Sequence, residues 1–297
     1  METRPMDYAG SWYPSSEQGC AVQIGKFTLE KNTPAVSAPG SKVTGRSVPD
    51  KPVRLGVAPH AGWVFSGALA AGVYAALDGG ETTPLVVVLG GHLGPGDPVL
   101  AMTEGSWQTP FGPFTIHSGF RSILESLPNV LFETPQNYHK DNSTELQLPF
   151  AKHRFPHAQL LPIRVPPSAV ALELGRNLGE YLSQVAPEAV VIASTDLTHY
   201  GPAYGFHPRG VGERALRWVR EVNDPMFIEA VKEGVGREMV DVAQRCHSAC
   251  SAGAVAALNE VATVRRARFR QLGYATSADA GPRDKENFVG YMGGVFV

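Results

Sequence analysis

Three short apolar runs, each followed by polar residues and a histidine, form the clearest pattern along this chain. The runs cover residues 53–59, 85–91 and 189–193, and they lead into His60, His92 and His199 in that order. Apolar runs of this length, bounded by turn residues, are typical of buried strands. Because ligands bind beside the carboxyl ends of the strands in open α/β sheets, the three histidines are predicted to share one site.

Three other segments have the composition of strands. Residues 99–102 and 288–297 are predicted strands. Residues 160–165 are predicted to lie at a sheet edge, because Pro162 has no N–H to donate to a ladder. Two segments without such a pattern are a surface loop over residues 31–52 and an aromatic, turn-rich segment that packs on the body of the fold, residues 1–16.

Helical periodicity fills most of the remaining chain. Apolar residues between Ser168 and Val185 recur at the spacing of one helical face. Ser66 is a candidate cap for a helix that runs to Leu77 and stops at Gly79-Gly80. Further helices are predicted near residues 120–127, 146–150, 209–222, 224–232 and 248–261. The alternation of strands and helices predicts a single α/β domain over residues 1–297, with a mainly parallel or mixed central sheet flanked by helices.

Composition excludes several classes of partner. The chain has 297 residues with 26 basic and 28 acidic side chains, a formal charge of −2, which favours neither nucleic acid nor an anionic membrane. No apolar run approaches the ~18 residues of a membrane span. The first seven residues lack the apolar core of a signal peptide, and three cysteines are too few for a disulfide framework. These features predict a cytoplasmic protein with reduced thiols.

The nine histidines divide into strand-end and other positions. A single strand-end histidine is usually structural, but three with the same placement favour metal binding or catalysis. His139 lies in a polar loop that the sequence does not place relative to the site. Four histidines in polar or proline-rich settings are assigned to the surface: His117, His153, His157 and His207.

Two cysteines, Cys246 and Cys250, are placed so that either could head the alanine-rich helix predicted over residues 248–261. Their C-x-x-x-C spacing fits neither haem attachment nor a closed structural zinc site. Either both are small buried hydrophobes, or one is a thiolate ligand favoured by the positive end of the helix. The residues alone leave both interpretations open.

Two acidic residues are candidates for catalysis or for orienting a catalytic group. Glu145 follows Asn142 by three residues, a capping-box pattern that would explain it structurally. Asp196 precedes His199 by three residues, so it could orient a histidine or fix its own turn.

The order of several motifs is similar to that of the Memo family, whose bacterial members are labelled AmmeMemoRadiSam system protein B. The resemblance spans nearly the whole chain from Ala9-Gly-Ser-Trp-Tyr-Pro14 onward. The motifs are Ala58-Pro-His-Ala-Gly62, Leu89-Gly-Gly-His92, Ser143-Thr-Glu-Leu-Gln-Leu-Pro-Phe150, Ile192-Ala-Ser-Thr-Asp-Leu-Thr-His-Tyr-Gly201, Ala249-Cys250, Tyr274-Ala-Thr-Ser-Ala-Asp279 and Val289-Gly-Tyr291.

This resemblance implies a fold similar to class III extradiol dioxygenases, which hold non-haem iron with two histidines and a carboxylate. In the Memo family a cysteine takes the carboxylate position. The implied metal ligands are therefore His60, His92 and Cys250, and His199 matches the acid/base histidine of the dioxygenases. Fe(II) or copper is the implied metal, with dioxygen as a candidate co-substrate.

Two positions depart from the pattern of the family. Asp141-Asn142-Ser143 stands where the family often has Glu-His-Ser, and Gly91-His92 is one residue shorter than the usual motif. Both changes are predicted to line the cleft, so the substrate or the reaction could differ from that of relatives.

Three functions fit these observations. The first is a metal-dependent redox enzyme acting on a small molecule, since two histidines and a thiolate leave open positions on a metal. The second is a protein that binds a peptide or small ligand in the same cleft without catalysis. The third is a protein that sequesters copper or iron. The sequence identifies no substrate and no oligomeric state.

Overall fold

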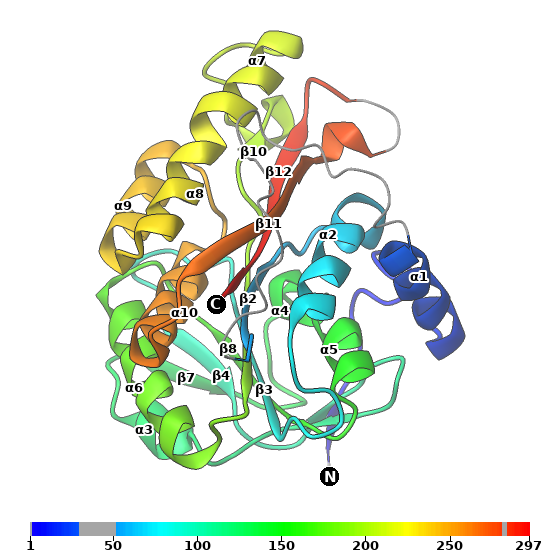
Figure 1. The fold of residues 1–297 in the computed structure, drawn as a ribbon, viewed down its shortest axis with the longest axis vertical. Helices are drawn as coiled ribbons and strands as arrows, with labels where there is room; N and C mark the ends of the chain where they lie inside the picture. The colour runs from blue at the N-terminus through cyan, green and yellow to red at the C-terminus, as the bar shows by residue number, and fades with distance from the viewer. Residues whose placement is uncertain (1, 30–51, 281–283) are drawn as a thin grey trace.

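A nine-stranded mixed sheet forms the centre of the protein in the computed structural model, which describes residues 2–29, 52–280 and 284–297 (Figure 1). Its main path runs β10-β12-β2-β9-β3-β8-β4-β7, with β11 paired to β12. The predicted α/β class with a mixed sheet is confirmed. Nearly all of the loop expected over residues 31–52 lies outside the described residues.

Four parallel strands make up the middle of the sheet. They are β2 (Leu55–Ala58), β9 (Val190–Ser194), β3 (Leu85–Gly90) and β8 (Gln159–Arg164). Every residue of β2, β9 and β3 is buried. Helices cover both faces of a parallel sheet, so its strands consist of continuous apolar runs. The three strands inferred from the apolar runs are therefore confirmed, and they lie side by side.

Antiparallel pairing begins on both sides of this parallel centre. On one side β4 (Val99–Met102) pairs antiparallel with β8 and parallel with β7 (Val130–Glu133). On the other side β12 (Phe288–Phe296) pairs antiparallel with β2, β10 (His199–Tyr200) and β11 (Phe269–Thr276). The strands expected at residues 99–102 and 288–297 are confirmed.

The expectation that residues 160–165 form an edge strand is wrong. Strand β8 lies between β3 and β4, and Pro162 is paired with Val88 of β3. The ladder between β8 and β4 covers only Ile163 and Arg164 and stops before Pro162. An interior strand can therefore contain this proline, because the neighbouring ladder has already ended where its missing N–H would matter.

Helices cover both faces of the sheet (Figure 1). One face packs against α6, α8, α9 and α10, and the other packs against α1, α2 and α5. Each face has its own large apolar cluster. The bounds are α1 (Glu17–Leu29), α2 (Trp63–Ala76), α5 (Leu148–Arg154), α6 (Ala169–Val185), α8 (Asp224–Glu233), α9 (Gly236–Cys246) and α10 (Ala252–Arg265).

Several helix boundaries differ from the sequence-based expectation. Helix α2 begins at Trp63, so Ser66 is inside its first turn and donates its hydroxyl to the Ala61 carbonyl instead of capping the helix. Residues 120–127 contain only the short α3 (Arg121–Glu125). The helix expected over residues 209–222 begins later, as α7 (Glu213–Trp218), and the π-helical turn Val219–Asn223 joins it to α8, which begins at Asp224 as expected.

A small second sheet ties the amino-terminal residues to the main body. It consists of β1 (Thr3–Arg4), β5 (Ser106–Trp107) and β6 (Phe114–Thr115). The following turn-rich residues pack on the body as expected, and α1 then lies beside α2.

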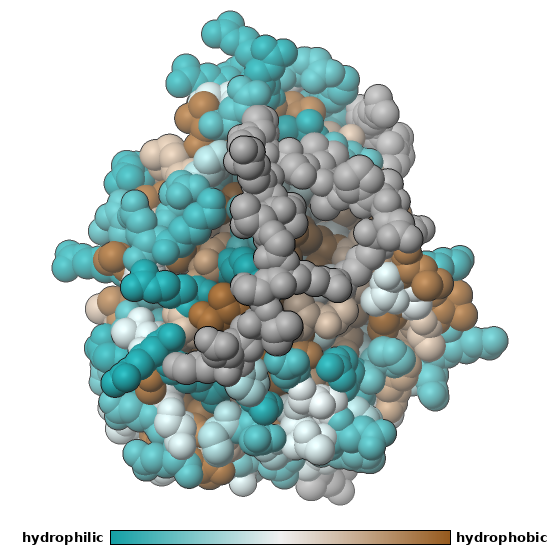
Figure 2. Space-filling model, viewed as in Figure 1, coloured by the Kyte–Doolittle hydropathy of each residue, from teal (hydrophilic) through white to brown (hydrophobic). Residues whose placement is uncertain are grey.

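The visible surface is mixed in polarity. Figure 2 shows hydrophilic residues over α7, α8 and α9, with hydrophobic residues in small separate groups. Among the helices of the described residues, none combines the length and the apolar character required to cross a bilayer.

We expect Gly175→Ala to destabilise the fold, because α6 contacts α10 closely at this glycine. A Cβ at position 175 would lie 2.3 Å from the carbonyl oxygen of Ala257, and backbone cannot easily move away. Overpacking of this kind lowers the free energy of unfolding by about 1–3 kcal/mol. The control is Gly72→Ala in α2, where a Cβ meets nothing within 4 Å and a gain of up to about 1 kcal/mol is expected. Urea denaturation measures both, and equal midpoints would contradict the proposed close contact.

Candidate metal centre

Three metal-ligating atoms meet at the carboxyl edge of the parallel strands. The Nε2 atoms of His60 and His92 are 3.1 Å apart, and the Sγ atom of Cys250 is 3.2 Å from His60 Nε2. All three donor atoms lie within 4.8 Å of one another. The structure therefore places together the three residues that the resemblance suggested as ligands.

The strand order explains why these side chains meet. Three residues of the site stand two positions beyond the end of a strand: His60 after β2, Asp196 after β9 and His92 after β3. These strands are neighbours in that order. Parallel strands that end at the same edge bring the residues after them to one place. The third donor, Cys250, comes from the loop before α10, directly before the N-cap residue Ser251.

The Nδ1 atom of each histidine is already engaged. His60 Nδ1 is 3.0 Å from the hydroxyl of Ser194, and His92 Nδ1 is 3.2 Å from the carboxylate of Asp141. Such contacts fix the tautomer and the ring orientation of metal-binding histidines. With Nδ1 engaged, the Nε2 atoms of the two rings face each other just beyond the ends of β2 and β3.

Cys250 has the surroundings of a thiolate. Burial alone would raise its pKa, but the adjacent imidazoles of His60 and His92 lower the pKa well below its usual range. The backbone N–H of Asp196 also donates to the sulfur at 3.3 Å. A partly exposed thiolate beside two imidazoles is a strong ligand for a transition metal.

Cys246 lies apart from this cluster, so the expectation that both cysteines could head the last long helix is wrong. Cys246 is the final residue of α9, and its sulfur is 3.8 Å from the sulfur of Met226. The next residue, His247, has φ of 50° and turns the chain away in the left-handed region. This reversal separates the two cysteines of the C-x-x-x-C motif.

Asp196 connects His60 with His199. One carboxylate oxygen accepts the backbone N–H of His60 at 2.7 Å, and the other is 3.8 Å from Nε2 of His199. Burial would lower the pKa of His199, but this carboxylate raises the pKa above its usual value. Asp196 thus faces His199, as an orienting role requires, and it fixes the loop of His60, a contact that the sequence did not suggest.

Glu145 does not cap its own helix, so the capping-box expectation is wrong. The cap of α4 (Asn142–Glu145) is Asp141, whose carboxylate accepts the N–H of Ser143. The fully buried carboxylate of Glu145 instead accepts the N–H groups of Asp7 and Tyr8 and the hydroxyl of Tyr13. Glu145 therefore holds the amino-terminal segment against the body, and it reaches the cleft only through Tyr13.

Both departures from the Memo motifs lie at the centre. Asn142 donates its side-chain amide to the carbonyl of His60 at 3.1 Å. In the short Gly91-His92 turn, Gly91 has φ of 114°, and a Cβ there would lie 2.8 Å from Cβ of Arg164. The shortened turn thus requires glycine, and Asn142 supports the loop of a ligand histidine.

A cleft of about 870 Å³ opens onto His60 and His92. Asn142, Asp196 and His199 also line it. Its aromatic walls are formed by Trp12, Tyr13, Trp63, Phe65, Tyr204 and Tyr291. A second hollow of about 410 Å³ contains Cys250 and shares His199 and Tyr204 with the cleft. Two hollows therefore adjoin the centre, and His199 lines both.

Five of the other six histidines lie away from the centre, and the sixth, His247, lines the second hollow. His153, His157 and His207 are exposed, as expected, and His117 is half-buried between Gln159 and Tyr181. His139, which the sequence did not place, lies beside Glu133 and does not line the cleft. Sequence reasoning missed Ser194 and Asp141 as partners of His60 and His92, although Ser194 directly follows the strand predicted over residues 189–193.

The fold and this cluster define an α/β protein with a candidate two-histidine, one-cysteine centre at the carboxyl ends of its parallel strands. The chain belongs to the Memo-like protein family, whose family model matches residues 4–295.

Relatives match over much of the chain. A MEMO1 family protein of Caldivirga maquilingensis is 35% identical over 209 residues, covering 68% of this chain and 71% of that protein. One from Thermococcus onnurineus is 28% identical over 298 residues, covering 97% of each chain. A solved structure of an uncharacterized protein from Escherichia coli K12 has a TM-score of 0.47 and 10% identity, covering 80% of this chain and 99% of that one.

Proposed function

We propose that this protein is a non-haem, metal-dependent redox protein that binds iron or copper through His60, His92 and Cys250 and acts on a small molecule in the cleft. The observation that carries the proposal is the convergence of two Nε2 atoms and one sulfur within 4.8 Å at a large open cleft. A purely structural cluster would have no need of an open approach from solvent.

The spacing of the donor atoms fits a transition metal. Bonds of about 2.0–2.3 Å that meet at about 90–110° separate their donor atoms by about 2.8–3.8 Å. The spacings of 3.1 Å between the two Nε2 atoms and 3.2 Å between Cys250 Sγ and His60 Nε2 fall in this range. The Nδ1 contacts to Ser194 and Asp141 are those that usually support metal-binding histidines.

The donor set favours iron or copper over hard cations such as Mg²⁺, because a thiolate is a soft ligand and imidazole suits Fe and Cu. A bound iron or copper ion would supply redox chemistry and Lewis acidity to the site. The thiolate replaces the carboxylate of the dioxygenases, which supports copper or a thiolate-tuned iron here. These three ligands would leave other coordination positions of a bound metal open to a molecule in the cleft.

His199 has the position of an acid/base in the proposed reaction. Its ring lines the cleft, and Asp196, 3.8 Å from Nε2, stabilises the protonated form. Because His199 is not one of the three converging donors, its proton remains free for exchange with a ligand in the cleft. We assign Asp196 the role of orienting this ring, and Glu145 the role of fixing the wall that contains Tyr13.

Binding without catalysis is the second candidate. The exposed aromatic side chains of Trp12, Phe65 and Tyr204 lie around the cleft, and such rings often anchor peptides or small ligands. A peptide would use the same walls and would not need the metal to turn over. Sequestration of copper or iron is the third reading, in which the cleft has no substrate.

Anaerobic purification with metal quantification tests the proposal first. A stoichiometric amount of iron or copper, lost from a His60→Ala variant, is the expected result, and absence of metal affinity would contradict the proposal. Oxygen uptake with candidate phenolic substrates then separates redox turnover from sequestration. Ligand binding by metal-free protein, without oxygen uptake in the loaded protein, would favour the binding function.

A further inference from the structure

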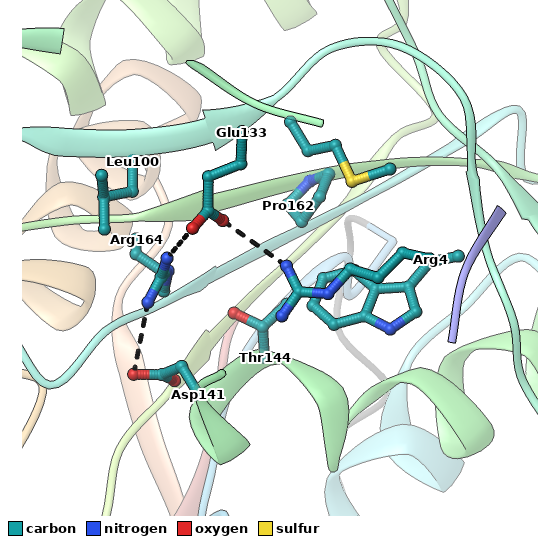
Figure 3. Close-up of a pocket in the computed structure, with 9 residues that line it drawn as sticks. Arg4, Leu100, Glu133, Asp141, Thr144, Pro162 and Arg164 are labelled. Atoms are coloured by element: carbon teal, nitrogen blue, oxygen red, sulfur yellow. Dashed lines mark hydrogen bonds and ion pairs between the residues drawn. The ribbon is translucent and has the colours of Figure 1, made fainter. Parts of the chain in front are cut away.

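Four buried charged side chains form a connected group (Figure 3), and one of them contacts His92. Arg4, Glu133, Arg164 and Asp141 are between 1% and 7% exposed. They come from β1, β7, β8 and the cap of α4, which are far apart in the sequence. We call these four residues the buried charge group. A buried charge is retained only where partners compensate its desolvation, so each contact in this group matters.

Glu133 lies between the two arginines. One oxygen contacts the guanidinium of Arg164 closely and accepts the N–H of His139 at 2.7 Å, and the other is 3.5 Å from Arg4. In Figure 3 the Glu133 carboxylate points at both guanidinium groups, and Arg164 extends from Glu133 toward Asp141.

Asp141 is the member of the group that touches the proposed centre. A single oxygen, Oδ2, receives both the backbone N–H and the Nδ1 of His92, each at 3.2 Å. The same oxygen is 3.8 Å from Nη1 of Arg164, beyond hydrogen-bond distance. The Arg164 guanidinium and His92 therefore both face Oδ2 of Asp141, and of these two only His92 lies within hydrogen-bond distance of it.

Without Glu133, Arg164 would have Asp141 as its nearest carboxylate. A buried guanidinium is strongly stabilised by a carboxylate partner. A shift of about 1 Å would bring the Arg164 guanidinium into a charge-assisted hydrogen bond with Oδ2 of Asp141. That bond would compete with His92 for the oxygen that orients its ring. The contact with Glu133 holds Arg164 short of this position.

We propose that Glu133 is a positioning residue: it holds Arg164 away from Asp141, so that the Asp141 carboxylate remains available to orient His92. This inference rests on the proposed function, because orientation of His92 matters most when its Nε2 binds a metal. Neither Glu133 nor Arg164 touches the three donor atoms, so both act through Asp141.

Arg4 completes the charge balance of the group. Arg4 and Arg164 together supply two positive charges, which balance the two carboxylates of the group. The Arg4 guanidinium packs between the rings of Trp107 and Tyr138, 3.6 and 3.8 Å from their centroids. The amino-terminal strand thereby anchors the second oxygen of Glu133 and limits its rotation. Docking of β1 is in this way connected to the geometry of His92.

The first test is Glu133→Gln in the full chain, with Co²⁺ as the probe. We expect its dissociation constant to rise about 10–100-fold, the usual effect of losing a partner behind a metal ligand, together with a changed visible spectrum of the Co²⁺ complex. The matched control is Glu260→Gln. It removes a carboxylate of α10 that pairs with Arg176 of α6, and it should leave both the dissociation constant and the spectrum unchanged.

The second variant tests the competition itself. Glu133→Gln combined with Arg164→Met removes the competing guanidinium, so Co²⁺ affinity and spectrum should return toward those of the wild type. A merely structural role of Glu133 predicts the opposite, because the double variant loses more buried contacts. A double variant that binds Co²⁺ no better than Glu133→Gln, or a single variant with wild-type affinity, would overturn the proposal.

A readout without metal separates this inference from the proposed function. The ¹⁵N shifts of the His92 ring in metal-free protein report its tautomer and hydrogen bonding. They should move in Glu133→Gln and return in the double variant, and unchanged shifts would overturn the inference. If the wild type fails to bind Co²⁺, iron or copper, the proposed function fails, and the ring shifts still decide the role of Glu133.

Discussion

Cys250→Ser is expected to abolish tight binding of iron or copper. A serine hydroxyl stays protonated near neutral pH and is a poor ligand for these metals, so two imidazoles would remain to hold the ion. The loss should exceed the ~10–100-fold typical of a residue behind a ligand, because a ligand itself is removed. Elemental analysis after anaerobic purification, followed by competitive titration with a chelator, measures the effect.

Cys246→Ser is the matched control for this experiment. Its sulfur lies at the end of α9 beside Met226, and the chain reversal at His247 keeps it away from the two histidines. Metal content and affinity should therefore remain close to those of the wild type. Equal losses from the two substitutions would argue instead for a site built from both thiols.

His199→Ala is expected to leave metal stoichiometry unchanged while turnover falls about 10²–10⁴-fold, the usual contribution of a positioned acid/base. The reason is geometric: His199 lines the cleft beside Asp196 but is not one of the three donors within 4.8 Å. His60→Ala and His92→Ala provide the contrast, because each removes a ligand and should lose metal and activity together.

The metal measurement comes first, because it requires no substrate. Asp196→Asn should give a smaller defect in turnover than His199→Ala, as expected for a residue that orients the ring. Asp196 also accepts the N–H of His60, so its substitution affects the ligand loop as well. If His199→Ala emptied the site as completely as His60→Ala, His199 would be a ligand and the assigned acid/base role would be wrong.

The middle of the fold could be predicted from the sequence because its strands are buried on both faces. Burial turns β2, β3 and β9 into uninterrupted apolar runs, which are visible without any tertiary information. Pro162 shows the limit of such reasoning: whether a proline is tolerated depends on where the ladder to β4 ends, and pairing partners are not encoded locally. Ser66 failed for a similar reason, since α2 begins three residues earlier at Trp63.

His60 and His92 could be predicted as candidate ligands because each follows a recognisable strand, and Cys250 was reached only through the resemblance to the Memo family. The residues that contact the Nδ1 atoms of His60 and His92 could not be predicted from the sequence. Ser194 and Asp141 lie 134 and 49 residues from the histidines that they contact, and short polar side chains next to strands are common. The correct role of Glu145 likewise depends on contacts with Asp7 and Tyr8, 138 and 137 residues away.

The wide separation of the contacting residues has a kinetic consequence. Cys250 is 190 residues from His60 in the sequence, and the segment before α1 docks on Glu145 across 138 residues. Chains dominated by such distant contacts fold slowly, since loop closure must precede the contacts that stabilise it. At a ribosomal rate of about 5–20 residues per second, His60 is synthesised roughly ten seconds or more before Cys250. A metal ion held by all three proposed ligands would therefore bind only after the first stages of folding on the ribosome.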